Sequence, residues 1–501
     1  MKISTILATL LATSTLALAA PAFAQDAAAP AADEAAPTAE ETAAQTAFLA
    51  AQVESLQAQL EALKKQIGTA APSWKGAPQW ADTSSGWSFK PKGVIQFDAG
   101  YITIPSKTGL KGQAVTVGGV NTNNLGWSSR ARRLIVGVEG SIPGDFTYKF
   151  ELQLSQGTVD YEDMVIGWQK AGSPWSVTLG YQYPLSSLEL LTSNRFTSFM
   201  ERSGNTDAFG YNRRLGGTVA YTAPDGLYGI AAGVYGNDTI NSDVYNRTSW
   251  QASVRGYYSP VIGAAQGHLG FQFQHRVAPR DAQGITYRLR PYTQVTDQRF
   301  INTGAIAADG DDILGAELAA VVHSFHFASE WQHVWVRGYQ PGQFPFSHIN
   351  NAISGTAYAG DPQFDSGYAE VGYFLTGETR GYKGGKWDRT KVLKPFNAGG
   401  WGAVQVNGRV DYTDLRDKVA SGATIVTTGN GANYVNGGRS VGYEASLIWL
   451  PTDYVKFMVQ YAHSDITGGP AAVAPFASVA KPIYDRSYGV DAVTMRAQLD
   501  F

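Results

Sequence analysis

The closing residues 493–501 alternate between apolar and polar side chains. In an extended strand successive side chains point to opposite faces, so the two kinds of side chain separate. A strand with one apolar and one polar face that ends on an aromatic residue is typical of a barrel with lipid outside and water inside. A soluble edge strand can alternate in the same way, and the rest of the chain distinguishes the two. One face holds Val493, Met495, Ala497, Leu499 and Phe501, and the other holds Thr494, Arg496, Gln498 and Asp500.

Residues 1–24 have the pattern of a secretory signal peptide. Lys2 precedes a run of mostly Ala, Leu, Ile and Thr, and Ala22-Phe23-Ala24 is a small-x-small cleavage site, so we expect removal after Ala24. No other stretch approaches the roughly 20 apolar residues of a membrane helix, which excludes a helical inner-membrane protein. The chain has no cysteine, which excludes a disulfide or thiolate–metal framework.

The composition fits a membrane barrel. The chain has 56 Gly, 26 Tyr, 12 Trp and 22 Phe but only 16% charged residues, which suits many turns and girdles of aromatic residues. Its mean hydropathy of −0.18 is low for a helical membrane protein but expected for a barrel, where only alternate residues face lipid. We therefore predict an all-β transmembrane β-barrel.

Three segments separate the predicted signal peptide from the predicted barrel. Residues 25–47 are mostly Ala, Pro and acidic residues with little to bury, and we predict a disordered tether. Residues 48–67 carry apolar side chains at alternating spacings of four and three, which predicts a short N-terminal coiled-coil helix and hence an oligomer. A single amphipathic helix packed on another protein is the alternative. Residues 68–86 are predicted to be a linker. The apolar positions of the helix are Leu49, Val53, Leu56, Leu60, Leu63 and Ile67.

Residues 87–501 show repeated short strands divided by Gly, Asn, Asp and Pro turns. Their length predicts about 16 antiparallel strands, at about 26 residues each with turns and loops included. The clearest alternating runs are Val94–Gly100, Thr147–Leu154, Val177–Tyr181, Thr218–Tyr221, Tyr443–Trp449 and Val455–Tyr461.

The barrel segment is close to electrically neutral. The chain has a formal net charge of −3, and the acidic residues of the tether outweigh that value. Without a global field, selection among ions must depend on where individual charges lie.

Residues 284–291 place two arginines on one face of a predicted strand. Ile285, Tyr287 and Leu289 form the apolar face, and Arg288 and Arg290 lie opposite. Because an Arg on the lipid face costs about 2–4 kcal/mol at mid-depth, we expect the pair in the lumen behind a lipid-facing row. Arg290 precedes a proline and could lie at the rim instead.

A second arginine cluster begins the run Arg130–Gly140. With Leu134 and Val136 outward, Arg133 faces inward. Arg132 is then in phase with the lipid face, so it must lie at the strand end or on a bulge. An interfacial anchor is the alternative role for this cluster.

Residues 180–216 are too long for a hairpin turn and combine hydroxyl side chains with Arg195 and Arg202. A loop of this length folded into a barrel forms a constriction, where Arg, Ser and Thr can replace the hydration shell of an anion. The spacing alone leaves a long surface loop as the alternative.

The run Ser186–Gly216 is the most specific of several that carry a family resemblance. It contains Glu-Leu-Leu-Thr-Ser, Phe-Met-Glu-Arg and Arg-Arg-Leu-Gly. These pieces resemble the phosphate-selective porin O/P family of outer-membrane channels, and the resemblance extends over about residues 87–501. The other matching runs are Arg130–Gly140, Tyr287–Pro291, Arg299–Gly304, Gly372–Glu378 and the closing strands.

The resemblance implies a homotrimer of barrels with about 16 strands each, in which an arginine ladder leads to a narrow, inward-folded loop. Two features depart from the family pattern: residues 184–203 contain no Lys, and Tyr292 stands where an acidic residue often follows. Arg binds oxyanions in a bidentate way, so anion passage is still expected, whereas a strict phosphate preference does not follow. The resemblance assigns Arg130, Arg132, Arg133, Arg288 and Arg290 to the ladder, Ser193, Arg195 and Arg202 to the constriction, and Arg213 and Arg214 to the next strand.

We predict passive, anion-selective diffusion of phosphate or related oxyanions, with no cofactor, no metal and no nucleic acid. The expected partners are these anions, outer-membrane lipid, two further copies of the chain, and the barrel-assembly machinery, which would recognise Phe501. The expected location is the outer membrane of a Gram-negative bacterium, with the coiled coil in the periplasm. The candidate anion-binding residues are Arg130, Arg132, Arg133, Ser193, Arg195, Arg202, Arg214, Arg288 and Arg290.

Three other classes of function were weighed. An enzyme is disfavoured, because His323 and His326 face opposite sides of an apparent strand and the other histidines are scattered, with no nucleophile elbow beside them. A general or sugar-conducting porin is the main alternative, since aromatic residues offer stacking surfaces to sugars. A structural link from the outer membrane to periplasmic material could coexist with a pore.

Overall fold

The computed structural model describes residues 47–59, 73–74, 76–82, 84–105, 108, 110, 125–236, 249–278, 284–339, 355–422, 424–472 and 481–501. The predicted signal peptide, almost all of the predicted tether and residues 60–67 of the predicted coiled coil lie outside them. The chain divides into two units, residues 1–68 and residues 69–501.

The first unit contains, within its described residues, one helix over residues 47–59. Leu49, Val53 and Leu56, which belong to the predicted a/d stripe, are all exposed on it. The coiled coil stays a prediction, because a stripe exposed on one chain does not show what covers it. None of the helices in the described part of the chain is long and apolar enough to cross a membrane.

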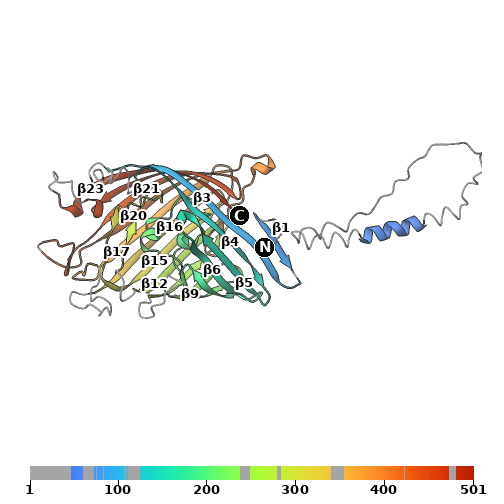
Figure 1. Cartoon of the computed structure of the whole chain (residues 1–501), viewed down its shortest axis with the longest axis horizontal. Helices are drawn as coiled ribbons and strands as arrows, with labels where there is room; N and C mark the ends of the chain where they lie inside the picture. The colour runs from blue at the N-terminus through green and yellow to red at the C-terminus, as the bar shows by residue number, and fades with distance from the viewer. Residues whose placement is uncertain are drawn as a thin grey trace, which may run out of the picture. The chain divides into compact units, whose positions relative to one another are not determined.

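The second unit is built around a closed antiparallel barrel, to which the described residues contribute 16 strands (Figure 1). Strands adjacent in sequence pair with one another, and β23 pairs with β3 to close the ring. The predicted strand number and class are therefore confirmed. The strands are β3 (Trp87–Ile102), β4 (Gly126–Ile142), β5 (Phe146–Gln153), β6 (Asp160–Trp168), β7 (Trp175–Gln182), β8 (Arg214–Thr222), β9 (Tyr228–Tyr235), β10 (Trp250–Tyr258), β12 (Ala265–Val277), β15 (Ala308–Val322), β16 (Phe325–Gly338), β17 (Gln363–Phe374), β20 (Ala403–Asp417), β21 (Val435–Thr452), β22 (Val455–Thr467) and β23 (Ser487–Asp500).

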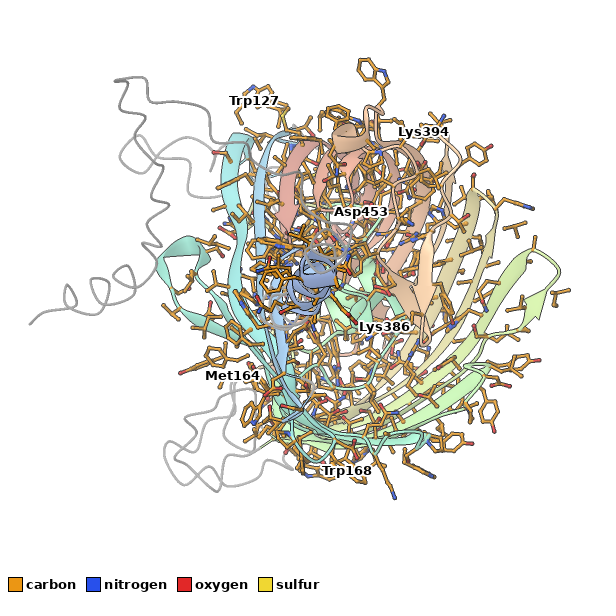
Figure 2. The ribbon with its side chains drawn as sticks, turned by 90° about the vertical axis from the view of Figure 1, so that its right-hand side faces the viewer. Trp127, Met164, Trp168, Lys386, Lys394 and Asp453 are labelled. Carbon is orange, nitrogen blue, oxygen red and sulfur yellow. The ribbon has the colours of Figure 1, made fainter. Side chains whose placement is uncertain are left out.

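The closing strand shows the alternation that its sequence predicts. Val493 and Met495 are 48% and 49% exposed on the outer face, whereas Thr494 and Arg496 are 1% and 2% exposed. The inward side chains are covered because segments folded into the lumen, which include a buried apolar cluster, pack against them. Figure 2 looks along the barrel and shows the side chains that fill it.

The two ends of the barrel differ in the length of their connections. At one end, called here the short-turn end, residues 323–324 and 453–454 suffice to join β15 to β16 and β21 to β22. At the other end, the long-loop end, residues 183–213 and 278–307 join β7 to β8 and β12 to β15. Short turns normally face the periplasm and long loops the outside.

Three connections contribute structure to the lumen. The connection after β7 contains two helices, the connection after β12 contains a small ribbon, and a hairpin enters from the short-turn end between β17 and β20. The elements are α3 (Leu188–Leu191), α4 (Gly204–Phe209), β13 (Arg288–Leu289), β14 (Ile301–Asn302), β18 (Gly381–Lys383) and β19 (Lys386–Asp388). Four 3-10 turns, Ser155–Gly157, Phe396–Ala398, Pro470–Ala472 and Ile483–Asp485, and the short strand β11 (Val261–Ile262) lie in other connections.

Part of the predicted linker forms a ribbon on the edge of the barrel. β1 (Ser73–Trp74) pairs with β2 (Pro78–Asp82), and β2 pairs with the first residues of β3. The register of β23 against β3 ends at Val94, so the beginning of β3 would otherwise present an unpaired edge. An added strand there satisfies the backbone groups and blocks edge-to-edge association.

The prediction of a wall strand over residues 284–291 is wrong. β13 pairs only with β14, outside the barrel sheet. Ile285, Tyr287 and Leu289 are buried rather than lipid-facing, and the Tyr287 hydroxyl donates a hydrogen bond to Asp311 of the wall. The same alternation arises because one face of this ribbon packs on other segments inside the barrel, which period alone cannot distinguish from a lipid face.

Candidate functional site

Residues 183–213, called here the constriction loop, are held inside the barrel through their own backbone. Side chains of the wall on the opposite side of the barrel form hydrogen bonds with the peptide N–H and C=O groups of the loop. Each of these hydrogen bonds ties one point of the loop backbone to the wall. Five such bonds are Arg496 Nη1 to Met200 O at 2.6 Å, Lys456 Nζ to Arg195 O at 2.6 Å, and the N–H groups of Met200, Gly204 and Glu189 to Gln460, Asp411 and Glu330, each at 2.7 Å.

Two short helices give the loop its internal shape. α3 begins after Ser187, whose hydroxyl accepts a hydrogen bond from Leu190 N–H at 3.3 Å. The Glu189 carboxylate accepts from Ser203 N–H at 2.9 Å and from Arg409 Nη2 at 2.7 Å. Glu189 therefore joins the start of α4 and the wall to α3.

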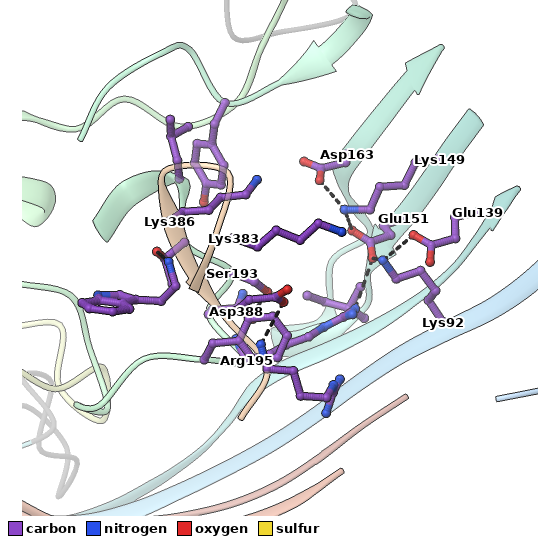
Figure 3. A pocket seen from close by; sticks show the side chains of 18 of the residues that line it. Lys92, Glu139, Lys149, Glu151, Asp163, Ser193, Arg195, Lys383, Lys386 and Asp388 are labelled. Carbon is purple, nitrogen blue, oxygen red and sulfur yellow. Dashed lines mark hydrogen bonds and ion pairs between the residues drawn. The ribbon is translucent and has the colours of Figure 1, made fainter. Parts of the chain in front are cut away.

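Two cavities lie on either side of the constriction. The larger, of about 850 Å³, includes residues of the hairpin β18–β19 and is called here the short-turn cavity (Figure 3). The smaller, of about 160 Å³, includes residues 289–294 and is called here the long-loop cavity. Tyr183, Leu190 and Arg202 line both cavities, so these side chains lie at the boundary between them.

Cationic side chains outnumber carboxylates in the short-turn cavity. Glu151 contacts Lys149 at 2.9 Å and Arg195 at 3.2 Å, while Lys92 contacts Glu139 at 2.7 Å. Figure 3 shows Lys383 and Lys386 reaching in from the hairpin toward Lys149 and Glu151. The cations that line this cavity are Lys90, Lys92, Lys149, Arg195, Arg202, Arg213, Lys383, Lys386 and Arg389, and the carboxylates are Glu139, Glu151, Asp163 and Asp388.

The predicted cluster at the start of β4 is brought to the constriction. Gln96 pairs with Arg133 and Phe97 with Ala131, which leaves Arg132 as the bulged residue. Arg132 forms an ion pair with Glu201, and Arg133 donates to Gln96 at 2.7 Å; both line the long-loop cavity. Arg130 instead forms an ion pair with Asp297 at 2.9 Å and lines neither cavity.

The residues that the family resemblance assigned to the constriction all belong to the constriction loop and border the two cavities. Ser193 and Arg195 line the short-turn cavity, and Arg202 lines both cavities. Arg202 donates to the carbonyl oxygens of Glu189 and Thr192 at 3.1 and 2.9 Å. No carboxylate of the described residues forms an ion pair with Arg202. Its guanidinium is therefore held in place by neutral carbonyl groups, which leave its positive charge uncompensated.

The remaining predicted arginines are divided. Arg290 lines the long-loop cavity and approaches Asp207 at 3.7 Å, whereas Arg288 is exposed on β13. Arg213 lines the short-turn cavity beside Glu162 and Asp163. Arg214 is buried against Gly236 O and the Ser249 hydroxyl and lines neither cavity.

Sequence reasoning missed the lysines of the short-turn cavity. The family comparison concerned residues 184–203, which contain no lysine. Lys90 and Lys92 instead come from β3, and Lys383 and Lys386 come from a connection at the short-turn end. The spacing Lys383-Gly-Gly-Lys386 in a Gly-rich turn was the available signal. Tyr183, which stacks under the Arg213 guanidinium at 4.1 Å, was missed as well.

Charge pairing shifts the protonation of groups in the loops. Burial alone would raise the pKa of the Glu201 carboxyl, but Arg132, Arg496 and Arg133 outweigh burial and hold that pKa well below its usual range. Burial lowers the pKa of the Lys386 ammonium, and the nearby charges of Arg255 and Lys149 lower it further. Glu201 is therefore ionised at neutral pH. Within the described residues no group of His, Cys, Asp or Glu side chains has the size and geometry to hold a metal ion.

Comparison with known proteins identifies the family. Residues 113–501 match the family model described as phosphate-selective porin O and P. The chain belongs to this family. The porin is 34% identical over 443 residues to an uncharacterized protein of Caulobacter vibrioides, which covers 86% of this chain and 77% of the relative. It is 26% identical over 412 residues to Porin O of Pseudomonas aeruginosa, which covers 77% of this chain and 85% of the relative.

The chain is also similar to solved structures at low sequence identity. The outer-membrane channel DcaP of Acinetobacter baumannii is 12% identical with a TM-score of 0.45, covering 84% of the porin and 99% of DcaP. An anion-selective porin from Comamonas acidovorans is 12% identical with a TM-score of 0.43, covering 83% of this chain and all of that one. Family membership makes the chain a porin of the outer membrane, a class of channel proteins rather than enzymes.

Proposed function

We propose that this porin allows passive, anion-selective diffusion of phosphate or related oxyanions across the outer membrane. The observation that carries the proposal is the short-turn cavity, where nine cationic side chains face four carboxylates. Glu139, Glu151 and Asp163 each form an ion pair with a cation, and Asp388 accepts a hydrogen bond from Arg389 N–H. Lys383 and Lys386 form no ion pair with a described residue. A permeating anion could therefore form ion pairs with the lysines of this cavity that have no carboxylate partner among the described residues.

The mechanism follows from the order of the cations along the pore. An anion that enters from the long-loop end first meets the cavity lined by Arg132, Arg133 and Arg290. It then passes Tyr183 and Arg202, where guanidinium donors replace part of its hydration shell. It leaves through the lysine-lined cavity, where several weak sites in succession favour release over trapping. No cofactor and no energy source enter this scheme.

The oligomer belongs to the proposal as well. The a/d pattern of residues 48–67 supports an oligomer, and a homotrimer is proposed from the family resemblance, with the predicted periplasmic helix holding three chains together. Recognition of Phe501 by the barrel-assembly machinery is proposed from the closing strand, in which Phe501 N–H donates to Gly93 O at 3.1 Å.

A planar bilayer with a KCl gradient tests the selectivity. The reversal potential should lie on the chloride side, and phosphate at sub-millimolar concentration should block the chloride current. Chloride selectivity without a phosphate block would restrict the proposal to a general anion pore. A reversal potential near zero or on the potassium side would overturn it and favour a general or sugar-conducting porin.

A further inference from the structure

The second part of the connection between β17 and β20, residues 391–402, takes no part in the pore and is called here the rim loop. It closes on itself: Gly402 N–H donates to Lys394 O at 2.9 Å, and Gly400 N–H donates to Pro395 O at 3.0 Å. Gly399 and Gly402 have φ angles of 74° and 80°, a region that favours glycine. The rim loop is therefore a shaped element, although a turn of two residues suffices at other positions of this barrel end.

The rim loop exposes large apolar side chains next to the lipid-facing wall. Leu393 is 59% exposed and Trp401 is 82% exposed. An aromatic series continues from the wall into the loop, with ring centroids 5.4 Å apart from Phe457 to Trp449, 5.4 Å from Trp449 to Phe396 and 6.4 Å from Phe396 to Trp401. The loop thus extends the apolar outer surface at its boundary, where aromatic residues favour the membrane interface.

The rim loop is also cationic. It contains Lys391 and Lys394, both exposed, and no acidic residue. Figure 2 places Lys394 at the outer edge of the ring of strands, whereas Lys386 lies inside it. The nearby carboxylates of Asp453 and Glu378 accept hydrogen bonds from the backbone N–H groups of Val392 and Leu393. Neither lysine forms an ion pair within the described part of the chain.

We propose that the rim loop binds an anionic phospholipid in the leaflet at the short-turn end. Lys391 and Lys394 bind the headgroup phosphate, while Leu393, Phe396 and Trp401 lie among the glycerol backbone and the upper acyl chain. Charge complementarity selects an anionic headgroup, since cations next to a membrane attract acidic lipids. Continuity with the lipid-facing Phe457 selects a membrane lipid over a soluble anion or a second protein. This inference is independent of the solute that the pore conducts.

The test uses the full purified chain, delipidated in detergent, with short-chain phosphatidylglycerol and phosphatidylcholine as probes. Bound lipids are counted by native mass spectrometry during titration. We expect the wild type to prefer phosphatidylglycerol by about thirtyfold, as two membrane-adjacent lysines would give. The K391Q/K394Q variant should bind the two lipids equally, and W401A should bind both more weakly. K418Q, at the other end of β20, is the matched control and should behave as wild type.

Two outcomes overturn the proposal. Equal binding of both lipids by the wild type, or an unchanged preference in K391Q/K394Q, would remove the headgroup role of the lysines. Soluble glycerol phosphate, added at the same concentration, should not displace phosphatidylglycerol; if it does, the site is a phosphate site without a lipid component. The shift in SDS-gel migration between unheated and boiled samples verifies that each variant has a folded barrel. A loss of lipid binding can then be distinguished from a loss of fold.

Discussion

Arg132 and Glu201 form a two-point ion pair that joins the barrel wall to the constriction loop, with Nε 2.7 Å from Oε1 and Nη2 2.9 Å from Oε2. Arg132 is the bulged residue of β4, and alternation alone would direct it toward lipid. The bulge turns the side chain into the lumen. One additional residue in the wall therefore supplies the anchor of a loop that begins and ends on other strands.

The E201Q variant should loosen the constriction loop. It leaves Arg132 and Arg496 without their shared carboxylate, and breaking a buried ion pair typically costs about 3–5 kcal/mol. We expect noisier single-channel currents and a larger mean conductance in planar bilayers. The R132Q/E201Q double variant should recover part of the wild-type trace, because no unpaired guanidinium of Arg132 is left. A quiet E201Q channel with unchanged conductance would show that the backbone bonds hold the loop without this pair.

The same carboxylate predicts a response to acid. The pKa of Glu201 lies well below its ordinary value of 4.5, since Arg132, Arg496 and Arg133 outweigh its burial. A carboxyl with a depressed folded-state pKa contributes stability that is complete above its unfolded pKa and is lost as pH falls through the folded pKa. The difference in thermal stability between wild type and E201Q should therefore be constant above about pH 5.5 and shrink in stronger acid. A difference that grows as pH falls would contradict the assignment.

Arg202 should control anion passage more than Arg214 does. Arg202 lines both cavities, whereas Arg214 lines neither. Because the Arg202 guanidinium has no carboxylate partner among the described residues, R202Q removes an uncompensated charge from beside the two cavities. A single good guanidinium contact of about 1.5–3 kcal/mol corresponds to roughly a tenfold effect or more. We expect R202Q to lower the chloride-to-potassium permeability ratio strongly and R214Q to leave it nearly unchanged. Equal losses in both variants would point to misfolding of the loop instead.

Conductance should fall with rising pH through the titration of Lys386. Burial, together with Arg255 and Lys149, lowers the pKa of this lysine below its ordinary value of 10.5. The ammonium therefore loses its charge at a lower pH than an ordinary lysine does, and the anion current should decline over that alkaline range. K386Q should reduce the current at neutral pH and remove this part of the pH profile. K170Q serves as the control, because Lys170 is an exposed lysine in the turn after β6. It should keep both the current at neutral pH and its decline at alkaline pH.

Tyr292 occupies the space that a side chain at position 442 would need. A β-carbon on Gly442 would lie 2.2 Å from the Tyr292 hydroxyl oxygen, and Tyr292 itself has a φ of 54°. G442A should displace the segment around Tyr292 and lower stability by about 1–3 kcal/mol, the usual range for overpacking. G408A is the matched control, because its added carbon would meet only the Glu444 carbonyl oxygen at 4.0 Å. Equal unfolding midpoints for the two variants would contradict the packing argument.

The strands of the wall could be predicted because their signal is local. Val493, Thr494 and Arg496 take the faces that a period of two assigns to them, and Arg132 was recognised as a residue that this period could not place. The bulge follows from that conflict. Residues 284–291 failed the same test, because Tyr287 faces other loops and Asp311 rather than lipid. Apolar alternation records that one face is covered without recording what covers it.

The composition of the pore could be predicted only in part. Arg132, Arg133, Arg195 and Arg202, which the sequence singled out, line the two cavities, and their role in anion passage stays a prediction. The wall residues that hold the loop could not be predicted from the sequence. Lys456 and the other holding side chains, on β16, β20, β22 and β23, bind backbone atoms of the loop. Backbone atoms are the same in every residue, so the sequence gives no sign of such contacts. The lysines of the hairpin β18–β19 were equally hidden, since they come from the opposite end of the barrel.

The sequence by itself determined that this chain forms a barrel, about how many strands close it, and which face of the clearly alternating strands meets lipid, because these properties follow from a period of two and from chain length. Only the tertiary structure decided which charges meet in the lumen. Arg202 has neutral partners, while Arg132 is paired with Glu201, although both are arginines beside the same loop. The reason is physical: charge pairing depends on distances between strands far apart in the chain, and these distances exist only once the ring has closed.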